Sequence, residues 1–151
     1  MKIEKILFPT DFSEGASHAL PYAVDLARHY NANLYILHVI YDIARATDSH
    51  IPHISADELY KGIAEWAQEE IGKCCIEDVR GLKDVKRVIL KGVPYEEIIK
   101  FAETEKIDII VMGTYGRMGL ERFLFGSTAE RVVRRGPCPV MTVRVPKHRK
   151  K

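Results

Sequence analysis

The sequence predicts one α/β domain built on a five-stranded parallel sheet with helices on both faces. Short apolar runs alternate along the chain with segments whose apolar residues recur every three or four positions, a pattern typical of βαβ units. The chain has 151 residues, of which 46% are hydrophobic and 29% are charged. A chain of this length and composition can bury one core without disulfides or a metal.

Five short apolar runs are the expected strands, at residues 5–9, 33–40, 85–90, 108–112 and 140–145. The first, second and fourth runs are almost entirely apolar, as strands buried on both faces are. The third run carries Lys86 and Arg87, and the fifth carries Thr142 and Arg144. These two strands are therefore expected at the edges, which is consistent with the strand order 3-2-1-4-5.

Four amphipathic segments between the strands are the expected helices. The first two have their apolar positions within residues 16–30 and 59–74. Pro21 lies inside the first pattern and is expected to kink or shorten that helix. The third helix opens at Pro94, because proline suits the first helical position. Residues 42–54 show no clear period and are interpreted as a long loop.

The fourth helix has the clearest boundaries. Residues 127–130, Ser-Thr-Ala-Glu, form a capping box with Ser127 as the expected N-cap. Arginines in its second half complement the negative end of the helix dipole, and Gly136-Pro137 ends the helix. We interpret these arginines as helix-end charges rather than as a nucleic-acid patch.

Charge and hydropathy argue against several classes of protein. Lys and Arg number 23 against 21 Asp and Glu, and four of the positive charges lie in a basic tail at residues 147–151. The domain itself, expected at residues 1–146, has no excess of positive charge, so no nucleic-acid partner is expected. No apolar run is long enough to span a bilayer and the N-terminus has no signal-peptide pattern, so we expect no membrane contact and a cytoplasmic protein.

The three cysteines, Cys74, Cys75 and Cys138, lack the spacing of metal ligands. They are interpreted as reduced thiols that behave as small, partly buried apolar residues, in preference to redox chemistry. His50 and His53 do not have a spacing that argues for a metal, and no metal site is predicted.

In a sheet of this order a ligand binds beyond the carboxyl ends of the strands, where the strand order changes direction. That point lies between the first and fourth strands, so the relevant segments are residues 9–11 and the residues from Gly113 onward. Glycines there let backbone N–H groups approach a ligand closely. The N-terminus of the fourth helix adds unpaired donors and a partial positive charge, which suit phosphate.

A turn and a helix cap that bind nothing are the structural alternative. Phosphate binding is favoured because the glycine-rich segment coincides with the switch point derived from strand composition. Neither the P-loop pattern nor the Gly-x-Gly-x-x-Gly pattern of dinucleotide-binding folds is present.

The glycine-rich segment has the spacing Gly-x2-Gly-x9-Gly-Ser, formed by Gly113, Gly116, Gly126 and Ser127. This spacing resembles the nucleotide-binding pattern of the universal stress protein family. The resemblance covers essentially the whole chain, including residues 6–13, 38–39 and 136–140. It implies a Rossmann-like sheet of order 3-2-1-4-5, a homodimer formed through the last strand and, for the subgroup with this motif, bound ATP.

The resemblance also implies roles for individual residues. Asp11 would meet the ribose, and any Mg²⁺ that accompanies ATP would be held by the phosphates. The adenine region would be formed by Pro9, Val39 and Met112. The phosphates would be held by Gly113, Gly116, Gly126, Ser127 and Thr128, with Arg117 as a further candidate.

Three of these residues have a structural interpretation as well. Asp11 fits the N-cap of a helix that has Glu14 at its third position, which requires no ribose; the resemblance favours the ribose. Met112 fits a core residue at a strand end nearly as well as an adenine contact. His38 is interpreted as satisfying a hydrogen bond near the sheet rather than as a base.

The sequence favours a nucleotide-binding regulatory or stress-response protein over an enzyme. Phosphoryl transfer needs a positioned nucleophile, charge neutralisation and usually Mg²⁺. The glycine motif offers donors without a lysine in its loop or a water-activating residue, so no catalytic residue is assigned. The alternatives are a slow or partner-dependent ATPase and a dimeric interaction module that binds no nucleotide.

Overall fold

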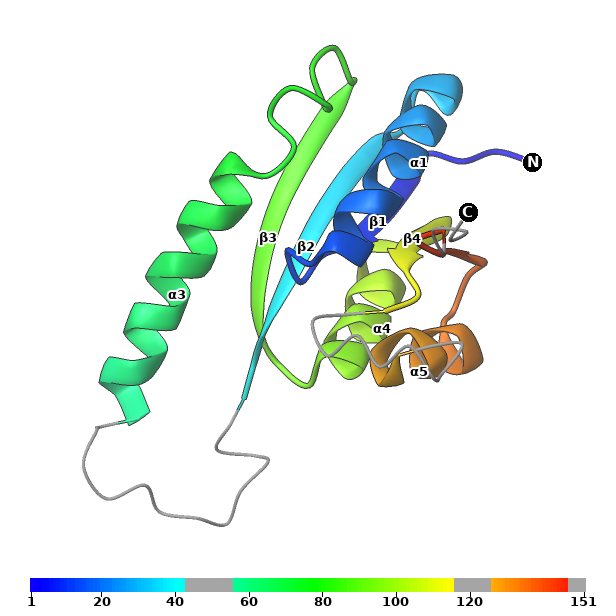
Figure 1. Cartoon of the computed structure of the whole chain (residues 1–151). Helices are drawn as coiled ribbons and strands as arrows, with labels where there is room; N and C mark the ends of the chain where they lie inside the picture. The colour runs from blue at the N-terminus through cyan, green and yellow to red at the C-terminus, as the bar shows by residue number, and fades with distance from the viewer. Residues whose placement is uncertain (43–55, 116–125, 147–151) are drawn as a thin grey trace, which may run out of the picture.

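In the computed structural model, strands and helices alternate along the chain as the sequence predicts (Figure 1). The structure describes residues 1–42, 56–115 and 126–146, so the basic tail and almost all of the expected loop at 42–54 lie outside the described residues. The elements are β1 (Lys5–Pro9), α1 (Glu14–Tyr30), β2 (Asn33–Tyr41), α3 (Ala56–Lys73), β3 (Asp84–Gly92), α4 (Pro94–Glu105), β4 (Ile109–Gly113), α5 (Ser127–Arg135) and β5 (Val140–Val143).

The strands form one sheet in the order β3-β2-β1-β4-β5, which confirms the predicted order. All neighbouring strands are parallel. β2 and β3 pair over nine positions, from Asn33 opposite Asp84 to Tyr41 opposite Gly92. β1 and β4 are neighbours although β2 and β3 separate them in the sequence. The order therefore changes direction between β1 and β4, at the predicted switch point.

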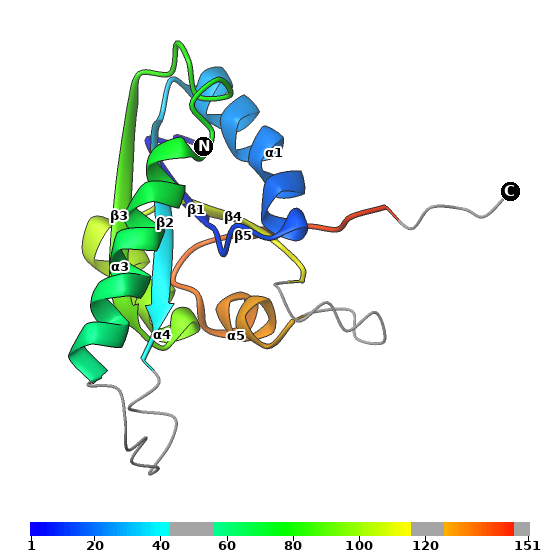
Figure 2. The ribbon, with the colours of Figure 1, turned by 60° about the vertical axis from the view of Figure 1, so that its left-hand side comes forward.

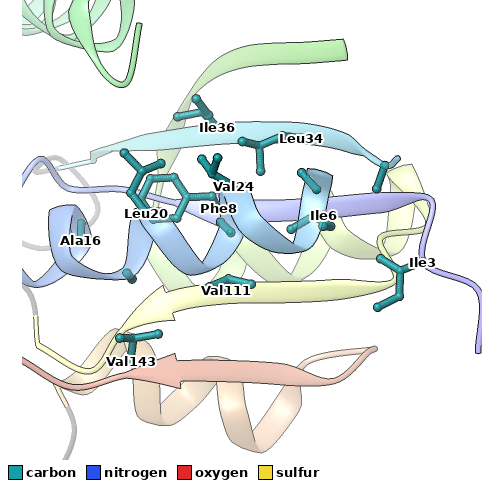
Figure 3. Packing of buried hydrophobic residues seen from close by; sticks show 14 of the residues in the cluster. Ile3, Ile6, Phe8, Ala16, Leu20, Val24, Leu34, Ile36, Val111 and Val143 are labelled. Atoms are coloured by element: carbon teal, nitrogen blue, oxygen red, sulfur yellow. The ribbon is translucent and has the colours of Figure 1, made fainter. Parts of the chain in front are cut away.

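Two helical layers cover the sheet. α1 and α3 cover one face of the sheet, where strand residues such as Phe8 and Ile36 are buried. Figure 3 shows Leu20 and Val24 of α1 close to these two side chains. α4 and α5 cover the other face, where Leu7 is buried. Because side chains alternate along a strand, the neighbours Leu7 and Phe8 belong to different layers. Figure 2 shows α1 and α5 on opposite sides of β4.

Helix α1 continues past Pro21 to Tyr30, so of the two outcomes expected for Pro21, a kink or a shorter helix, the shorter helix was wrong. Proline removes the hydrogen bond to the carbonyl four residues earlier, which belongs to Ser17. Both Pro21 and Ser17 lie on the exposed side of the helix. Water can therefore satisfy the Ser17 carbonyl, and the helix tolerates the proline.

Helix α5 begins one residue earlier than its capping box predicts. Gly126 is the N-cap, with an extended backbone (φ −69°, ψ 159°), and its carbonyl accepts from the N–H of Glu130 at 3.0 Å. Ser127 is therefore the first helical residue and not the cap. The helix ends at Arg135, before Gly136, as predicted.

Strand β5 is shorter than predicted and ends at Val143 rather than at Val145. Its partner β4 ends at Gly113, which lies opposite Val143, so there is no further strand to pair with. Among the described residues, no helix has the length and apolar character needed to cross a membrane.

Candidate functional site

The segment between β1 and α1 is held by its own side chains. The Thr10 hydroxyl accepts from the N–H of Phe12, and a carboxylate oxygen of Asp11 accepts from the N–H of Ser13, each at 3.0 Å. Ser13 is the N-cap of α1, and its hydroxyl accepts from the N–H of Ala16 at 3.3 Å. The N-cap interpretation of Asp11 was therefore wrong, because Ser13 has that role.

An aromatic cluster of Phe12, His38 and Trp66 fixes this segment to β2 and α3. The His38 ring is buried and its Nδ1 donates to the Thr10 carbonyl at 2.8 Å, as the sequence interpretation of His38 requires. Phe12 stacks on His38 with ring centroids 4.5 Å apart and meets Trp66 edge-on at 5.5 Å. Phe12 has a left-handed backbone, with φ 61°, which this packing holds in place.

The end of β4 lies against the first turn of α1. A β-carbon on Gly113 would be 2.6 Å from the Gly15 carbonyl oxygen, and a β-carbon on Gly15 would clash with the Tyr115 carbonyl. Backbone meets backbone at this junction, so both glycines are required by packing. Conformational freedom is not the reason, because the described glycines with positive φ are Gly81 and Gly92.

Thr114 joins the end of β4 to the start of α5. Its N–H donates to the Val143 carbonyl at 3.0 Å, and its carbonyl accepts from the N–H of Gly126 at 2.6 Å. Its side-chain hydroxyl is buried, with the residue 5% exposed, and has no hydrogen-bond partner among the described residues. A buried hydroxyl without a partner costs free energy, so this one is suited to a ligand that supplies the missing hydrogen bond.

The N-terminus of α5 has no side-chain cap within the described part of the chain. The first N–H groups of a helix have no partner inside the helix, and the dipole places a partial positive charge there. Ser127 is exposed and Thr128 is half-buried in this first turn. Together these groups can hold an anion such as phosphate.

The structure brings most of the predicted site residues to the side of the sheet where the strands have their carboxyl ends. Pro9 ends β1 and Met112 and Gly113 end β4, while Val39 lies near the end of β2. Met112 is 6% exposed and packs in the layer under α4 and α5, as a core residue at a strand end does. Asp11 follows β1, and Gly126, Ser127 and Thr128 form the start of α5. Gly116 and Arg117 lie outside the described residues.

Three features of this edge were not predicted from the sequence. They are the contact of Gly15 with β4, the unpartnered hydroxyl of Thr114 and the stacking of Phe12 on His38. The signal for Gly15 is its position, because glycine in a first helical turn is a poor helix former and suggests close packing. In the described parts of the chain, no group of three or more His, Cys, Asp or Glu side chains could hold a metal ion.

A parallel sheet of this order, covered by helices on both faces, defines a Rossmann-like domain. The chain belongs to the universal stress protein family, whose sequence profile matches residues 2–144. It is 37% identical to Universal stress protein MJ0531 of Methanocaldococcus jannaschii, over 95% of this chain and 84% of that protein.

Solved structures share the fold closely. The universal stress protein UspA from Lactobacillus plantarum has a TM-score of 0.83 at 30% identity, covering 95% of this chain and 99% of that one. MJ0577, a Methanocaldococcus jannaschii relative, has a TM-score of 0.83 at 34% identity, covering 97% and 99%. Two more distant family structures, at 20% and 22% identity and TM-scores of 0.70 and 0.65, are complexes with cAMP and, from Archaeoglobus fulgidus, with dAMP.

Proposed function

We propose that this chain binds ATP at the carboxyl ends of β1 and β4 and acts as a regulatory protein in the response to stress. The observation that supports this best is the start of α5. Among the described residues the N-terminus of α5 has no side-chain cap, and Thr114, whose carbonyl accepts from the Gly126 N–H, has a buried hydroxyl without a partner. A phosphate group would accept hydrogen bonds from both, and the helix dipole would favour its charge.

The ribose, the adenine and the remaining phosphates would contact residues at the ends of the strands and at the start of α5. Asp11 would accept from a ribose hydroxyl, since its hydrogen bond to the Ser13 N–H already orients the carboxylate. Any Mg²⁺ would be held by the phosphates. Adenine would lie against Pro9, Val39 and Met112. The phosphates would lie against Gly113, Gly126, Ser127 and Thr128. Gly116 and Arg117 are assigned to the phosphates on the family pattern alone.

The ligands of the two distant relatives support an adenine nucleotide as the class of ligand. One of those proteins is in complex with cAMP and the other with dAMP, and both ligands contain adenine and one phosphate group. ATP is proposed over a monophosphate because of the Gly-x2-Gly-x9-Gly-Ser spacing and the polar groups at the start of α5.

Calorimetric titration with ATP, ADP, AMP and cAMP tests the proposal. We expect a Kd for ATP of about 1 μM, or about −8 kcal/mol, because backbone donors without a dedicated lysine bind phosphate moderately. ATP at a thousand times Kd should then stabilise the fold by about 4 kcal/mol. If millimolar ATP gives neither heat nor protection from thermal unfolding, the chain is an interaction module without a nucleotide.

Phosphate release from ATP, compared with a protein-free blank, separates a binder from an enzyme. We expect no turnover beyond a slow background, since the described residues at the site include no lysine and no base placed beside the start of α5. Sustained turnover would establish an ATPase instead.

We further propose a homodimer that forms through β5. Carbonyl groups of Pro139 and Val143 accept from β4, so Val140 and Thr142 direct their backbone groups away from the sheet. No strand pairs with that side of β5 among the described residues. A second copy related by a two-fold axis would pair the two edges antiparallel. The proline that precedes the strand and Pro146 that follows it limit the pairing to a short stretch.

Sedimentation at micromolar concentration tests the dimer. A single species at 17.2 kDa would eliminate it. Thr142→Pro removes an N–H that points away from β4, so it should weaken the dimer without affecting the β4–β5 hydrogen bonds. A dimer unchanged by this substitution would place the interface elsewhere.

A further inference from the structure

The turn that follows α3 brings two adjacent cysteines into contact. The N–H of Cys74 still bonds to the Glu70 carbonyl at 2.8 Å, whereas Cys75 has a left-handed backbone with φ 66°. This change of direction places the Sγ atoms of Cys74 and Cys75 2.6 Å apart. The two thiols are therefore in direct contact and not merely adjacent in sequence.

The two thiols differ in their surroundings. Cys75 packs against the core under α1 and α3, together with Val79 and Leu82. Both cysteines are free and only partly buried, so a small solute can reach the pair. Cys75 is thus held against the core, and both thiols remain partly exposed.

Arg87 of β3 binds the C-terminal end of α3 beside this pair. Its Nε donates to the Ile71 carbonyl at 3.0 Å, and its Nη2 donates to the Cys74 carbonyl at 3.2 Å. A helix C-terminus carries a partial negative charge, which disfavours a thiolate. The guanidinium satisfies two of these carbonyls and brings a full positive charge close to the Cys74 sulfur.

The contact makes the two sulfurs chemically unequal. The hydrogen bond from the Cys75 thiol lowers the pKa of Cys74, burial raises it, and the charge of Arg87 lowers it further, against Asp78 and Glu70. The same hydrogen bond and burial raise the pKa of Cys75. Because Arg87 binds the Cys74 carbonyl while Cys75 packs against the core, Cys74 is the sulfur that becomes a thiolate first, and thiolates are the nucleophiles.

We propose that Cys74 and Cys75 form a redox-active dithiol that reduces hydroperoxides and closes to an intramolecular disulfide. In the first step the Cys74 thiolate attacks one peroxide oxygen. An S–O bond forms as the O–O bond breaks, and the leaving oxygen departs as water, or as an alcohol from an organic hydroperoxide, after taking a proton. Cys74 is then a sulfenic acid.

In the second step the Cys75 sulfur attacks the sulfur of Cys74. An S–S bond forms as the S–O bond breaks, and the hydroxyl group leaves as water with the Cys75 proton. The peroxide gains two electrons and the two thiols lose two. Because the sulfurs already touch, the second step requires no large movement of the chain.

Cys138 is an internal control for this chemistry. It packs against the opposite helical layer, and burial raises its pKa, with the charge of Asp108 adding to the effect. A thiol with a raised pKa reacts slowly with peroxide. Selective oxidation of Cys74 and Cys75 over Cys138 is therefore the signature of the proposed site.

The test uses the purified chain, treated with a small excess of hydrogen peroxide and then quenched. We expect two of the three thiols to disappear, with a fall of about 2 Da in the intact mass, and dithiothreitol to restore both. Peptide mapping should join Cys74 to Cys75. Cys138→Ser should give the same loss of two thiols.

Cys75→Ser separates the two steps, since it removes only the second sulfur. We expect this variant to gain about 16 Da and to be trapped by dimedone at Cys74, because no thiol resolves the sulfenic acid. Equal oxidation of Cys138 and Cys74, or a product in Cys75→Ser identical to that of the unmodified chain, would overturn the proposal. Thermal unfolding of each variant confirms that the fold is retained.

Discussion

Two helices begin at the ends of neighbouring strands, and they begin in different ways. α1 follows β1, and its N-terminus is closed by Ser13, whose hydroxyl accepts from the Ala16 N–H. α5 follows β4 in the chain, and its N-cap is Gly126, which has no side chain to offer. The N-cap serine of α1 thus satisfies a backbone N–H of the first helical turn. In α5 no side chain among the described residues does the same.

The surroundings of the two helix ends strengthen the contrast. Gly15, in the first turn of α1, packs directly against the backbone of β4, so there is no space for a ligand at that contact. The start of α5 lies on the other side of the sheet, joined to β4 through the carbonyl of Thr114. An anion bound at this edge is therefore expected at α5 rather than at α1.

The largest expected effect concerns the packing of α1 against β4. Gly113→Ala places a β-carbon 2.6 Å from the Gly15 carbonyl oxygen, so the backbone must move. We expect the free energy of unfolding to fall by about 3 kcal/mol, as in other overpacked sites. Urea denaturation measures this change.

Gly62→Ala is the matched control, because a β-carbon there meets nothing within 4 Å. Gly62 lies inside α3, where alanine should stabilise by about 0.5 to 1 kcal/mol. Equal stability changes in the two variants would mean that the α1–β4 junction has room for a side chain.

The strands and their order could be predicted because burial determines their composition. β1 was predicted at Lys5–Pro9, since a strand covered on both faces is continuously apolar. Lys86 and Arg87 predicted that β3 is an edge strand, because a central strand is covered by helices on both faces and would bury such charged side chains. Local sequence carries this information, so the prediction did not depend on knowing any tertiary contact.

The details of the site could not be predicted because they depend on contacts between distant segments. The N-cap of α5 is Gly126 and not the predicted Ser127, and the N–H of Gly126 donates to the carbonyl of Thr114, which directly follows β4. The need for glycine at position 113 comes from Gly15, about a hundred residues earlier, and not from its own φ. No local pattern reports either contact.

The next largest effect concerns Asp11, which lies between β1 and α1. If Asp11 accepts from a ribose hydroxyl, Asp11→Ala should weaken ATP binding by about 2 kcal/mol, the range for a hydrogen bond to a charged group. Stability should fall by about 1 kcal/mol, since the bond from the Ser13 N–H is lost as well. Calorimetry and denaturation on the same variant measure both quantities.

Asp11→Asn provides the control for the Asp11 prediction, because its amide oxygen can still accept from Ser13. We expect it to recover most of the stability while ATP binding stays weaker than in the unmodified chain, since the charge is lost. Unchanged ATP affinity in both variants would exclude Asp11 from the ribose site.

Thr114→Val tests the α5 side directly. The hydroxyl is buried without a partner, so replacing it with a methyl group should raise the stability of the nucleotide-free protein by about 1 kcal/mol. ATP affinity should fall by about 1.5 kcal/mol, because a phosphate oxygen loses a donor. Stability and affinity would thus move in opposite directions, whereas a purely structural hydroxyl would leave affinity unchanged.

The smallest effects come from the two serines, and they test the contrast between the helix ends most directly. Ser13→Ala removes the cap of α1 and should cost about 1 kcal/mol of stability, with ATP affinity unchanged. Ser127 is exposed in the first turn of α5 and caps nothing, so Ser127→Ala should leave stability unchanged and cost about 0.5 to 1 kcal/mol of ATP affinity. Denaturation and calorimetry on both variants give four values. If Ser13→Ala weakens ATP binding as much as Ser127→Ala does, then the nucleotide contacts α1 as well, and the two helix ends share a single site.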